Sequence, residues 1–381
     1  MRLLEMRYSE YDDRPREWKL QGCTLADINL LVGENASGKT RTLHVIKALA
    51  DLLSSDRRIF FGNFEAIFSE ENERVKYCLL IKDGLVVNEN LYFNDENRLS
   101  RDEDGRGTIF SKEFDQDMKF QVPKNELAAK IKRDSYQHPF LEGLRQWADN
   151  LIHFYFGTYL GKDTYRPRNP EEGIKEVEIN LKDTNNAIEV FEAGKSRFGD
   201  NYVDEVIQDM VSIGYHVDDI HTGPPQGVRV DARFATIIGF KVEEENVAAP
   251  LDQHVISQGM FRALSVLIQL NYAAMAGHAS CVLIDDIGEG LDFDRADKLI
   301  RLLLRKAKEG SFQLIMSTND RFVMNSVPLE YWTLVHRSRN VVRCFNQRNS
   351  PELFKNFELT GLNNFDFFSG NFLQDYLKNN V

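Results

Sequence analysis

The sequence predicts an α/β fold in which a mainly parallel sheet is flanked by helices and carries a large inserted lobe of strands and helices. Three observations lead to this prediction. The apolar run Ile28–Val32 is followed by a glycine-rich loop and then by a helical pattern. A second apolar run ends in two adjacent carboxylates, Asp285 and Asp286. The stretch between these runs is far longer than one connection requires, which indicates an insertion.

The glycine-rich loop fits the phosphate-binding pattern G-x-x-x-x-G-K-[ST]. It reads Gly33-Glu34-Asn35-Ala36-Ser37-Gly38-Lys39-Thr40. Residues 39–53 then carry leucines and an isoleucine at helical spacing, so the loop joins a strand to a helix. In that setting, backbone N–H groups and the helix N-terminus cradle phosphates. We expect residues 33–41, including Arg41, to contact ATP, with Lys39 on its β/γ-phosphates and the Thr40 hydroxyl on Mg²⁺.

The second half of the expected core begins with a buried strand at residues 279–284. An aspartate at the end of such a strand can hold the Mg²⁺ shell, and this interpretation applies to Asp285. A helix is expected over residues 295–308, ended by Gly310, and a strand over residues 312–316. A late hairpin is expected from strands at 332–335 and 341–345.

The expected insertion covers residues 58–250, between core segments 1–57 and 251–350. Strands are predicted at 64–68, 77–81 and 85–87, and a charged, turn-rich stretch at 90–107. Residues 127–152 and 203–213 are predicted to be helical, and 227–242 to form paired strands. Residues 161–185, which include Pro167 and Pro170, are predicted to be a surface connection. An aromatic-rich tail at 351–381 is expected to pack on the core or on a partner.

Composition limits the classes of function. The chain has 381 residues, 42% of them hydrophobic, and a net charge of −12, which argues against a broad nucleic-acid surface. Its four cysteines form no C-x-x-C pair, as is usual in a reducing cytosol. The first twenty or so residues contain no apolar stretch of the kind that signal peptides have. We therefore expect a cytoplasmic protein without a membrane partner.

A second candidate anion site precedes the Asp285 strand. Ile256-Ser257-Gln258-Gly259-Met260 opens a long apolar helix, and a Ser-x-Gly turn at a helix start presents N–H groups to an anion. The sequence resembles the L-S-G-G-Q signature of ATP-binding-cassette (ABC) ATPases, keeping Ser257 and Gly259. Its place directly before the Asp285 strand strengthens the resemblance.

Together these motifs resemble ABC-type ATPases of the SMC/RecF/OLD group, including the AAA-type ATPases of bacterial anti-phage modules. Asp285-Asp286-Ile287-Gly288-Glu289-Gly290-Leu291-Asp292 is similar to their D-E-I-E-N-G-L-H/D. The resemblance implies a homodimer, or a higher assembly, with ATP at the interface. Lys39 of one subunit and Ser257 and Gly259 of the other would share each nucleotide.

Two departures from the family pattern concern hydrolysis. Asp286 stands in place of the glutamate that orients the attacking water, and Asn319 in place of the switch histidine. Asparagine can hydrogen-bond a γ-phosphate but cannot titrate, and aspartate is one methylene shorter than glutamate. We expect Asp286, Asn319 and Lys39 to carry a slow catalysis.

Weaker signals leave alternatives open. His216-Val217-Asp218-Asp219-Ile220-His221 could hold a metal, although a structural role is favoured. The basic residues near 124–145 could touch a phosphate backbone, but a solvated helix face is favoured. Arg262 could face the opposite nucleotide or pair with an acid on its own helix.

The function favoured by these observations is a sensor or regulatory ATPase of a defence system that controls a separate effector, such as a nuclease. The alternative is a RecF-like repair ATPase that binds DNA directly. A transporter ATPase subunit is a third and weaker interpretation.

Overall fold

The computed structural model describes residues 1–71, 73–168, 179–226, 236–278, 280–310 and 312–380. The chain forms two compact units. Unit 1 comprises Met1–Leu151, Gln313–Asn319 and Val327–Val381, and unit 2 comprises Ile152–Phe312 and Asp320–Ser326. The glycine-rich loop therefore belongs to unit 1, whereas Ser257 and Asp285 belong to unit 2.

Unit 1 is built on a long sheet with the strand order β16-β3-β17-β18-β2-β1-β4-β5-β6-β7-β8-β9. Its strands are β1 (Arg2–Glu10), β2 (Trp18–Thr24), β3 (Ile28–Val32), β4 (Gly62–Glu70), β5 (Glu73–Lys82), β6 (Leu85–Phe93), β7 (Glu96–Arg101), β8 (Arg106–Ser111), β9 (Gln116–Gln121), β16 (Gln313–Thr318), β17 (Trp332–Ser338) and β18 (Val341–Asn346). A 3₁₀ turn, η1 (Leu329–Tyr331), precedes β17.

The strand before the glycine-rich loop is central in this sheet. β3 pairs in parallel with β16 on one side and with β17 on the other. All five of its residues are buried, which explains why its sequence is continuously apolar. The helix α1 (Lys39–Ser54) follows the loop, as the spacing of residues 39–53 predicts.

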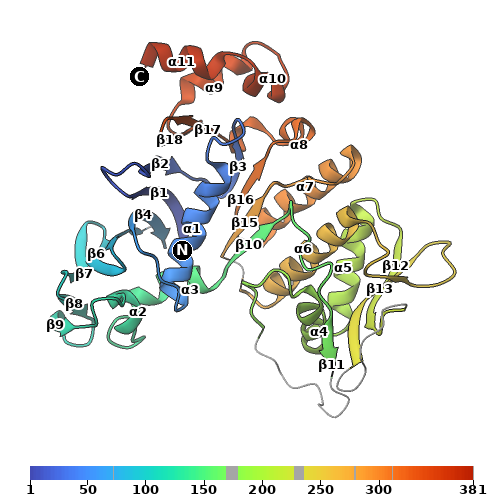
Figure 1. Ribbon diagram of the computed structural model, residues 1–381, viewed down its shortest axis with the longest axis horizontal. Helices are drawn as coiled ribbons and strands as arrows, with labels where there is room; N and C mark the ends of the chain where they lie inside the picture. The colour runs from blue at the N-terminus through green and yellow to red at the C-terminus, as the bar shows by residue number, and fades with distance from the viewer. Residues whose placement is uncertain (72, 169–178, 227–235, 279, 311, 381) are drawn as a thin grey trace. The chain divides into compact units, whose positions relative to one another are not determined.

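The strands β4 to β9 form an antiparallel lobe, visible in Figure 1 as a succession of hairpins. The expectation of a turn-rich stretch at 90–107 is wrong, because β6 and β7 occupy most of it. The two strands are joined by Asn94 and Asp95, which both have positive φ as a tight hairpin turn requires. Charged side chains alternate with buried ones, because one face of an antiparallel sheet can remain in water.

A buried polar network ties this lobe to the next helix. Glu89 on β6 is fully buried and accepts hydrogen bonds from the Tyr77 hydroxyl (2.9 Å) and the Ala128 and Ala129 amides (2.6 and 2.9 Å). The two amides begin α2 (Ala128–Ile131), so the carboxylate stabilises the positive end of that helix.

The single helix expected over residues 127–152 is wrong. It is divided into α2 and α3 (Phe140–Asp149), and the chain then enters β10 (Leu151–Tyr155). Asp134 interrupts the helical pattern by accepting hydrogen bonds from the Tyr136 and Gln137 amides, a local turn that competes with helix.

Unit 2 has a helical core. Its helices are α4 (Ala187–Phe198), α5 (Asp200–Ser212), α6 (Gln258–Met275), α7 (Phe293–Glu309) and α8 (Arg321–Ser326). The central helix is α6, which contacts α4 and α5 (Figure 1). It is apolar around nearly its whole circumference because almost all of it is buried.

The strands of unit 2 form two groups. β10 lies beside β15 (Cys281–Asp285). A smaller sheet has the order β11-β13-β12, with β14 also paired to β13. Its strands are β11 (Arg166–Arg168), β12 (Val217–Gly223), β13 (Thr236–Glu244) and β14 (Leu251–Asp252). The predictions for residues 169–178, including Pro170, for 227–235 and for Ala279 lie outside the described residues.

The tail of the chain forms α9 (Pro351–Glu358), α10 (Asn364–Ser369) and α11 (Phe372–Asn380). Its aromatic side chains gather around Phe367, whose ring centroid is 4.5 Å from that of Phe357 and 5.0 Å from that of Phe354. Phe367 also lies 6.3 Å from Trp332 of β17. The three helices lie beyond β17 and β18 in Figure 1. Among the described residues, no helix is both long enough and apolar enough to cross a membrane.

Candidate nucleotide site

The glycine-rich loop has the backbone that phosphate binding requires. Gly38 has φ 108° and is the residue before α1, and Ala36 also lies in the left-handed region with φ 63°. Such turns direct successive N–H groups into a concave anion site. Gly33 is needed for a different reason, because a Cβ there would lie 2.4 Å from the Val335 carbonyl oxygen. Glycine is therefore required at position 38 by the backbone conformation and at position 33 by close packing.

Lys39 is held over this loop. Its Nζ donates to the Gly33 carbonyl at 2.7 Å and to the Glu34 carbonyl at 3.1 Å, and the residue is only 5% exposed. The first turn of α1 contains no acidic residue. The buried Lys39 ammonium and a helix N-terminus without an acidic residue in its first turn both favour an anion, and the exposed residues Glu34, Asn35 and Ala36 leave the loop accessible.

Thr40 and Asn319, which the sequence predicts to belong to the nucleotide site, lie at the same end of unit 1 as the loop. Thr40 is exposed in the first turn of α1. Asn319 directly follows Thr318, which pairs with Val32 in the parallel register of β16 and β3. Asn319 and Gly33 therefore leave neighbouring strands at the same edge, where ligands of open α/β sheets bind.

Arg41 is engaged with protein groups. Its guanidinium forms an ion pair with Glu10 and lies 4.3 Å from the centre of the Trp18 ring. Glu10 also accepts a hydrogen bond from the Tyr8 hydroxyl at 2.7 Å. Glu10 thus offsets the positive charge that Arg41 brings to the start of α1.

The sequence analysis missed the contribution of the β17–β18 hairpin. Arg337 donates to the Ala36 carbonyl at 3.4 Å and to the Arg339 carbonyl at 2.7 Å. The pKa of His336 is lowered mainly by burial, and Arg343 lowers it further while Glu34 opposes the shift. One signal was available, since the hairpin concentrates Arg337, Arg339 and Arg343 in a chain of net charge −12.

In unit 2, Asp285 ends β15 and is 6% exposed, while its carbonyl accepts a hydrogen bond from the Phe156 amide at 3.0 Å. Asp286 has φ 55°, an uncommon conformation that aspartate tolerates better than most residues. The chain turns directly after β15, so Asp286 belongs to a turn rather than to the strand. Glu289, two positions before Leu291, is exposed.

The Ser257 turn is an N-cap in the structure. The Ser257 hydroxyl accepts a hydrogen bond from the Met260 amide at 3.1 Å and begins α6. The next glycine packs against the turn after Asp285, because a Cβ on Gly259 would lie 2.5 Å from the Gly290 carbonyl oxygen. Unit 2 thus brings Ser257 and Gly259 together with the turn that follows β15.

Arg262 connects α6 to the turn after β15 through hydrogen bonds. Its guanidinium donates to the carbonyls of Thr158 (2.7 Å), Glu289 (2.7 Å) and Gly157 (3.1 Å), and the residue is 9% exposed. Of the two alternatives for Arg262, pairing with an acid on its own helix is wrong. Its donors bind backbone carbonyls of two loops, which makes Arg262 a structural link between α6 and the turn after β15.

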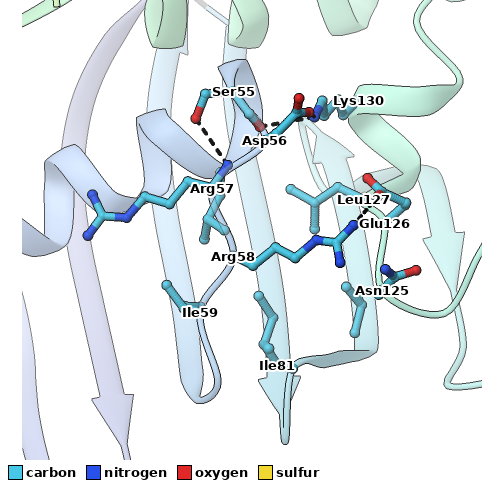
Figure 2. A pocket seen from close by; sticks show the side chains of 13 residues that line it. Ser55, Asp56, Arg57, Arg58, Ile59, Ile81, Asn125, Glu126, Leu127 and Lys130 are labelled. Carbon is cyan, nitrogen blue, oxygen red and sulfur yellow. Dashed lines mark hydrogen bonds and ion pairs between the residues drawn. The ribbon is translucent and has the colours of Figure 1, made fainter. Parts of the chain in front are cut away.

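A pocket lies at the other end of α1 (Figure 2). Arg57, Arg58 and Lys130 line it together with Ile59 and Ile81, and Figure 2 shows the Arg57 and Arg58 side chains extending in opposite directions. Each cation has an acidic partner: Arg57 pairs with Asp51, Arg58 with Glu126 and Lys130 with Asp56. Lys130 also donates to the Ser55 carbonyl at 2.9 Å, just past α1. These contacts stabilise the negative end of the helix.

The basic residues singled out near this pocket do not share one helix face, since α2 and α3 are separate. Their partners are local: Lys124 pairs with Asp104, Arg133 with Glu142 and Arg145 with Asp149, while Lys132 lies over the Phe120 ring. The three ion-paired cations offer less to a phosphate backbone than unpaired cations would.

One family of known proteins matches most of the chain. It is described as "AAA domain, putative AbiEii toxin, Type IV TA system", and residues 28–325 match it. The chain belongs to this family. The AbiEii-type AAA match includes the glycine-rich loop, the Ser257 turn, Asp285 and Asn319, so the predicted ABC/SMC-like P-loop ATPase family is confirmed.

Solved structures confirm the α/β fold of this AbiEii-type AAA protein. An Smc head bound to the C-winged helix domain of ScpA has a TM-score of 0.52 at 10% identity, over 91% of this chain and 97% of that one. An Smc head with an extended coiled coil, bound to the C-terminal domain of ScpA derived from Pyrococcus furiosus, has a TM-score of 0.51 at 10% identity, over 94% and 99%. No curated protein matches the chain at a significant level.

Proposed function

We propose that this AAA/SMC-head-type ATPase binds MgATP, hydrolyses it slowly as a homodimer, and regulates a separate effector in a bacterial defence system. The observation that carries the proposal is the loop from Gly33 to Thr40. Its left-handed turns, its lysine held over the loop carbonyls and the acid-free first turn of α1 fit a triphosphate.

In this proposal, separate residues bind the phosphates, hold Mg²⁺ and orient the attacking water. Lys39 and the loop amides bind the β- and γ-phosphates, and the Asn319 amide donates to the γ-phosphate. Thr40 and Asp285 are the oxygen ligands suited to Mg²⁺, which would neutralise charge between the β- and γ-phosphates. Asp286 accepts a hydrogen bond from the attacking water and orients it toward the γ-phosphorus.

Slow turnover follows from the position of Asp286. Its side chain is one methylene shorter than glutamate, and it begins a turn with φ 55°. A water held even about 1 Å from its best position can reduce the rate by about a hundredfold. A slow ATPase keeps its ATP-bound state long enough for that state to act as a signal.

The homodimer is supported by the second helix N-terminus. Ser257 and Gly259 begin the 18-residue α6, and one nucleotide needs only the N-terminus of α1. We propose that the Ser257 turn binds the γ-phosphate held by the partner subunit. The defence role is supported by the name of the AbiEii family, and the described chain gives no second catalytic motif that would act as an effector.

The decisive experiment measures steady-state ATP hydrolysis, and mass by light scattering with and without ATP, for wild type and Lys39→Ala. Slow turnover and ATP-dependent dimerisation, both lost in Lys39→Ala and both indifferent to duplex DNA, are expected. Turnover as fast as that of ordinary ABC ATPases, or strong stimulation by DNA, would contradict the switch and favour the RecF-like alternative.

The link to defence needs its own test. Cells that carry the protein and its genomic neighbours should reduce phage plating, and Lys39→Ala should abolish that effect. Unchanged plating, together with purification of the protein without any second component, would contradict the regulatory role.

A further inference from the structure

A cluster of metal-ligating side chains lies on the β12–β13 hairpin, in a part of the chain that the proposed function does not use. Asp219 and Glu243 are directly opposite each other in the antiparallel ladder. His221, two residues along β12, has its side chain on the same face as Asp219. The ligand atoms of these three residues all lie within 4.8 Å of one another.

The geometry centres on the imidazole. His221 Nδ1 is 3.1 Å from Asp219 Oδ2 and 3.9 Å from Glu243 Oε1. Ligands about 2.0–2.2 Å from one Zn²⁺ ion are themselves only a few ångströms apart. A small rotation of the three side chains would therefore place a ligand from each on one ion.

The strand register places two like charges together in this cluster. Carboxylates directly opposite each other on neighbouring strands destabilise a sheet. Here both carboxylates share His221 as a partner. The nearest lysine in the ladder, Lys241 opposite His221, is buried in an ion pair with Asp252. Lys241 therefore does not offset the repulsion between the Asp219 and Glu243 carboxylates, whereas a divalent ion bound between them would.

The scaffold beneath the cluster is buried. Ile220 and Val242 alternate with the cluster residues along β12 and β13, and both are fully buried. The three polar side chains are each between about one-third and one-half exposed, so an ion can reach them from solvent. Beside the cluster, His216 Nδ1 lies 3.5 Å from Glu245 Oε2, and both of these side chains are more exposed than those of Asp219, His221 and Glu243.

We propose that Asp219, His221 and Glu243 bind one divalent transition-metal ion, with Zn²⁺ as the best match to one imidazole and two carboxylates. Three protein ligands leave a fourth position for water or for a group from a partner. The site would cross-link β12 to β13 and so stabilise the small sheet of unit 2. This inference does not depend on the proposed ATPase function.

The test is isothermal titration of tag-free, chelator-treated protein with Zn²⁺ in the absence of nucleotide, at pH 7.5. Wild type is compared with His221→Ala and with Asp219→Asn, which keeps the side-chain shape. His216→Ala is the matched control, because it removes a more exposed histidine of the same hairpin. The cysteines are the same in all variants, so thiol binding cancels in the comparison.

We expect one site in wild type and in His216→Ala, weakened at least about tenfold in His221→Ala and Asp219→Asn. Zn²⁺ should also raise the melting temperature of wild type but not of His221→Ala, since binding to the native state stabilises it. Lys39→Ala should bind Zn²⁺ like wild type, which separates this site from the nucleotide site. No binding by wild type, equal binding by His221→Ala, or an equal loss in His216→Ala would overturn the assignment.

Discussion

Gly259 at the start of α6 lies directly against Gly290 in the turn after β15, with room for no side chain between them. A Cβ on Gly259 would lie 2.5 Å from the Gly290 carbonyl oxygen and 2.9 Å from Leu291 Cδ2. Arg262 joins the same two segments through the Glu289 carbonyl. The Ser257 turn and the turn that contains Asp286 are therefore coupled by backbone packing.

Gly259→Ala should separate these turns. We expect a loss of about 1–3 kcal/mol of stability from overpacking, and a fall in ATP turnover of about tenfold or more because Ser257 and Asp286 shift together. Chemical denaturation and steady-state ATPase assays measure the two effects. Gly223→Ala is the control, because its Cβ would make only an ordinary contact, 3.6 Å from Lys241 Cγ. Equal turnover in Gly259→Ala and wild type would show that the coupling has no role in hydrolysis.

The charge and the length of Asp286 can be separated by two substitutions. Asp286→Asn keeps the shape and tolerates positive φ, so stability should change little while turnover falls by about a hundredfold or more. Asp286→Glu should raise turnover several-fold while costing about 1 kcal/mol of stability in the left-handed turn. Single-turnover ATP hydrolysis measures both. If Asp286→Asn retained full activity, another residue would have to orient the water.

Arg337 is predicted to be a phosphate contact supplied by the β17–β18 hairpin. Arg337→Ala should weaken ATP binding about tenfold, equivalent to about 1.4 kcal/mol, because it removes a positive charge beside the Ala36 carbonyl. Fluorescent-nucleotide titration measures the change, and it should shrink at high salt. Arg343→Ala is the matched control on the same hairpin, where Arg343 bonds Gln21. Equal losses of ATP affinity in both variants would mean that the hairpin acts only through its overall positive electrostatic potential and that Arg337 makes no specific phosphate contact.

Glu89 should be essential for the stability of the antiparallel lobe. Glu89→Ala removes the acceptor for the Tyr77 hydroxyl and two α2 amides, and it removes the acidic neighbour that interacts most strongly with the buried Arg101 guanidinium. We expect a loss of about 3–5 kcal/mol, measured by urea unfolding. Tyr77→Phe removes one hydrogen bond of the network and should cost only about 1 kcal/mol. Similar costs for the two variants would contradict a central role for the carboxylate.

The His336 pKa predicts a pH effect. Burial lowers this pKa in the folded state, so below the unfolded value of about 6.5 the unfolded chain binds the proton more readily. The stability contributed by the neutral imidazole is therefore complete above about pH 6.5 and declines as the pH falls toward the folded pKa. His336→Gln should reduce the difference in melting temperature between pH 5.5 and pH 7.5. His278→Gln, at an exposed position, should leave that difference unchanged.

The parts of this protein that depend on residues close together in the chain could be predicted from the amino-acid sequence alone. The strand at Ile28–Val32, the glycine-rich loop and α1 lie within one short segment, where apolar periodicity and the glycines define a phosphate loop. The family and the fold could be predicted from that segment together with the order of the Ser257, Asp285 and Asn319 motifs. The roles of Asp285, Asp286, Asn319 and Ser257, and the domain limits, remain predictions.

Contacts that depend on strand register and on packing between distant segments became known only from the folded chain. Arg337 reaches Ala36 although 301 residues separate them, and Gly33 is a glycine because Val335 passes beside it. The opposition of Asp219 to Glu243 exists only in the register of β12 and β13. Residues 90–107 were predicted to be turns because their charges resemble those of a loop, whereas sheet pairing makes most of them strand. Local sequence does not specify such pairings, because contacts between distant segments decide them.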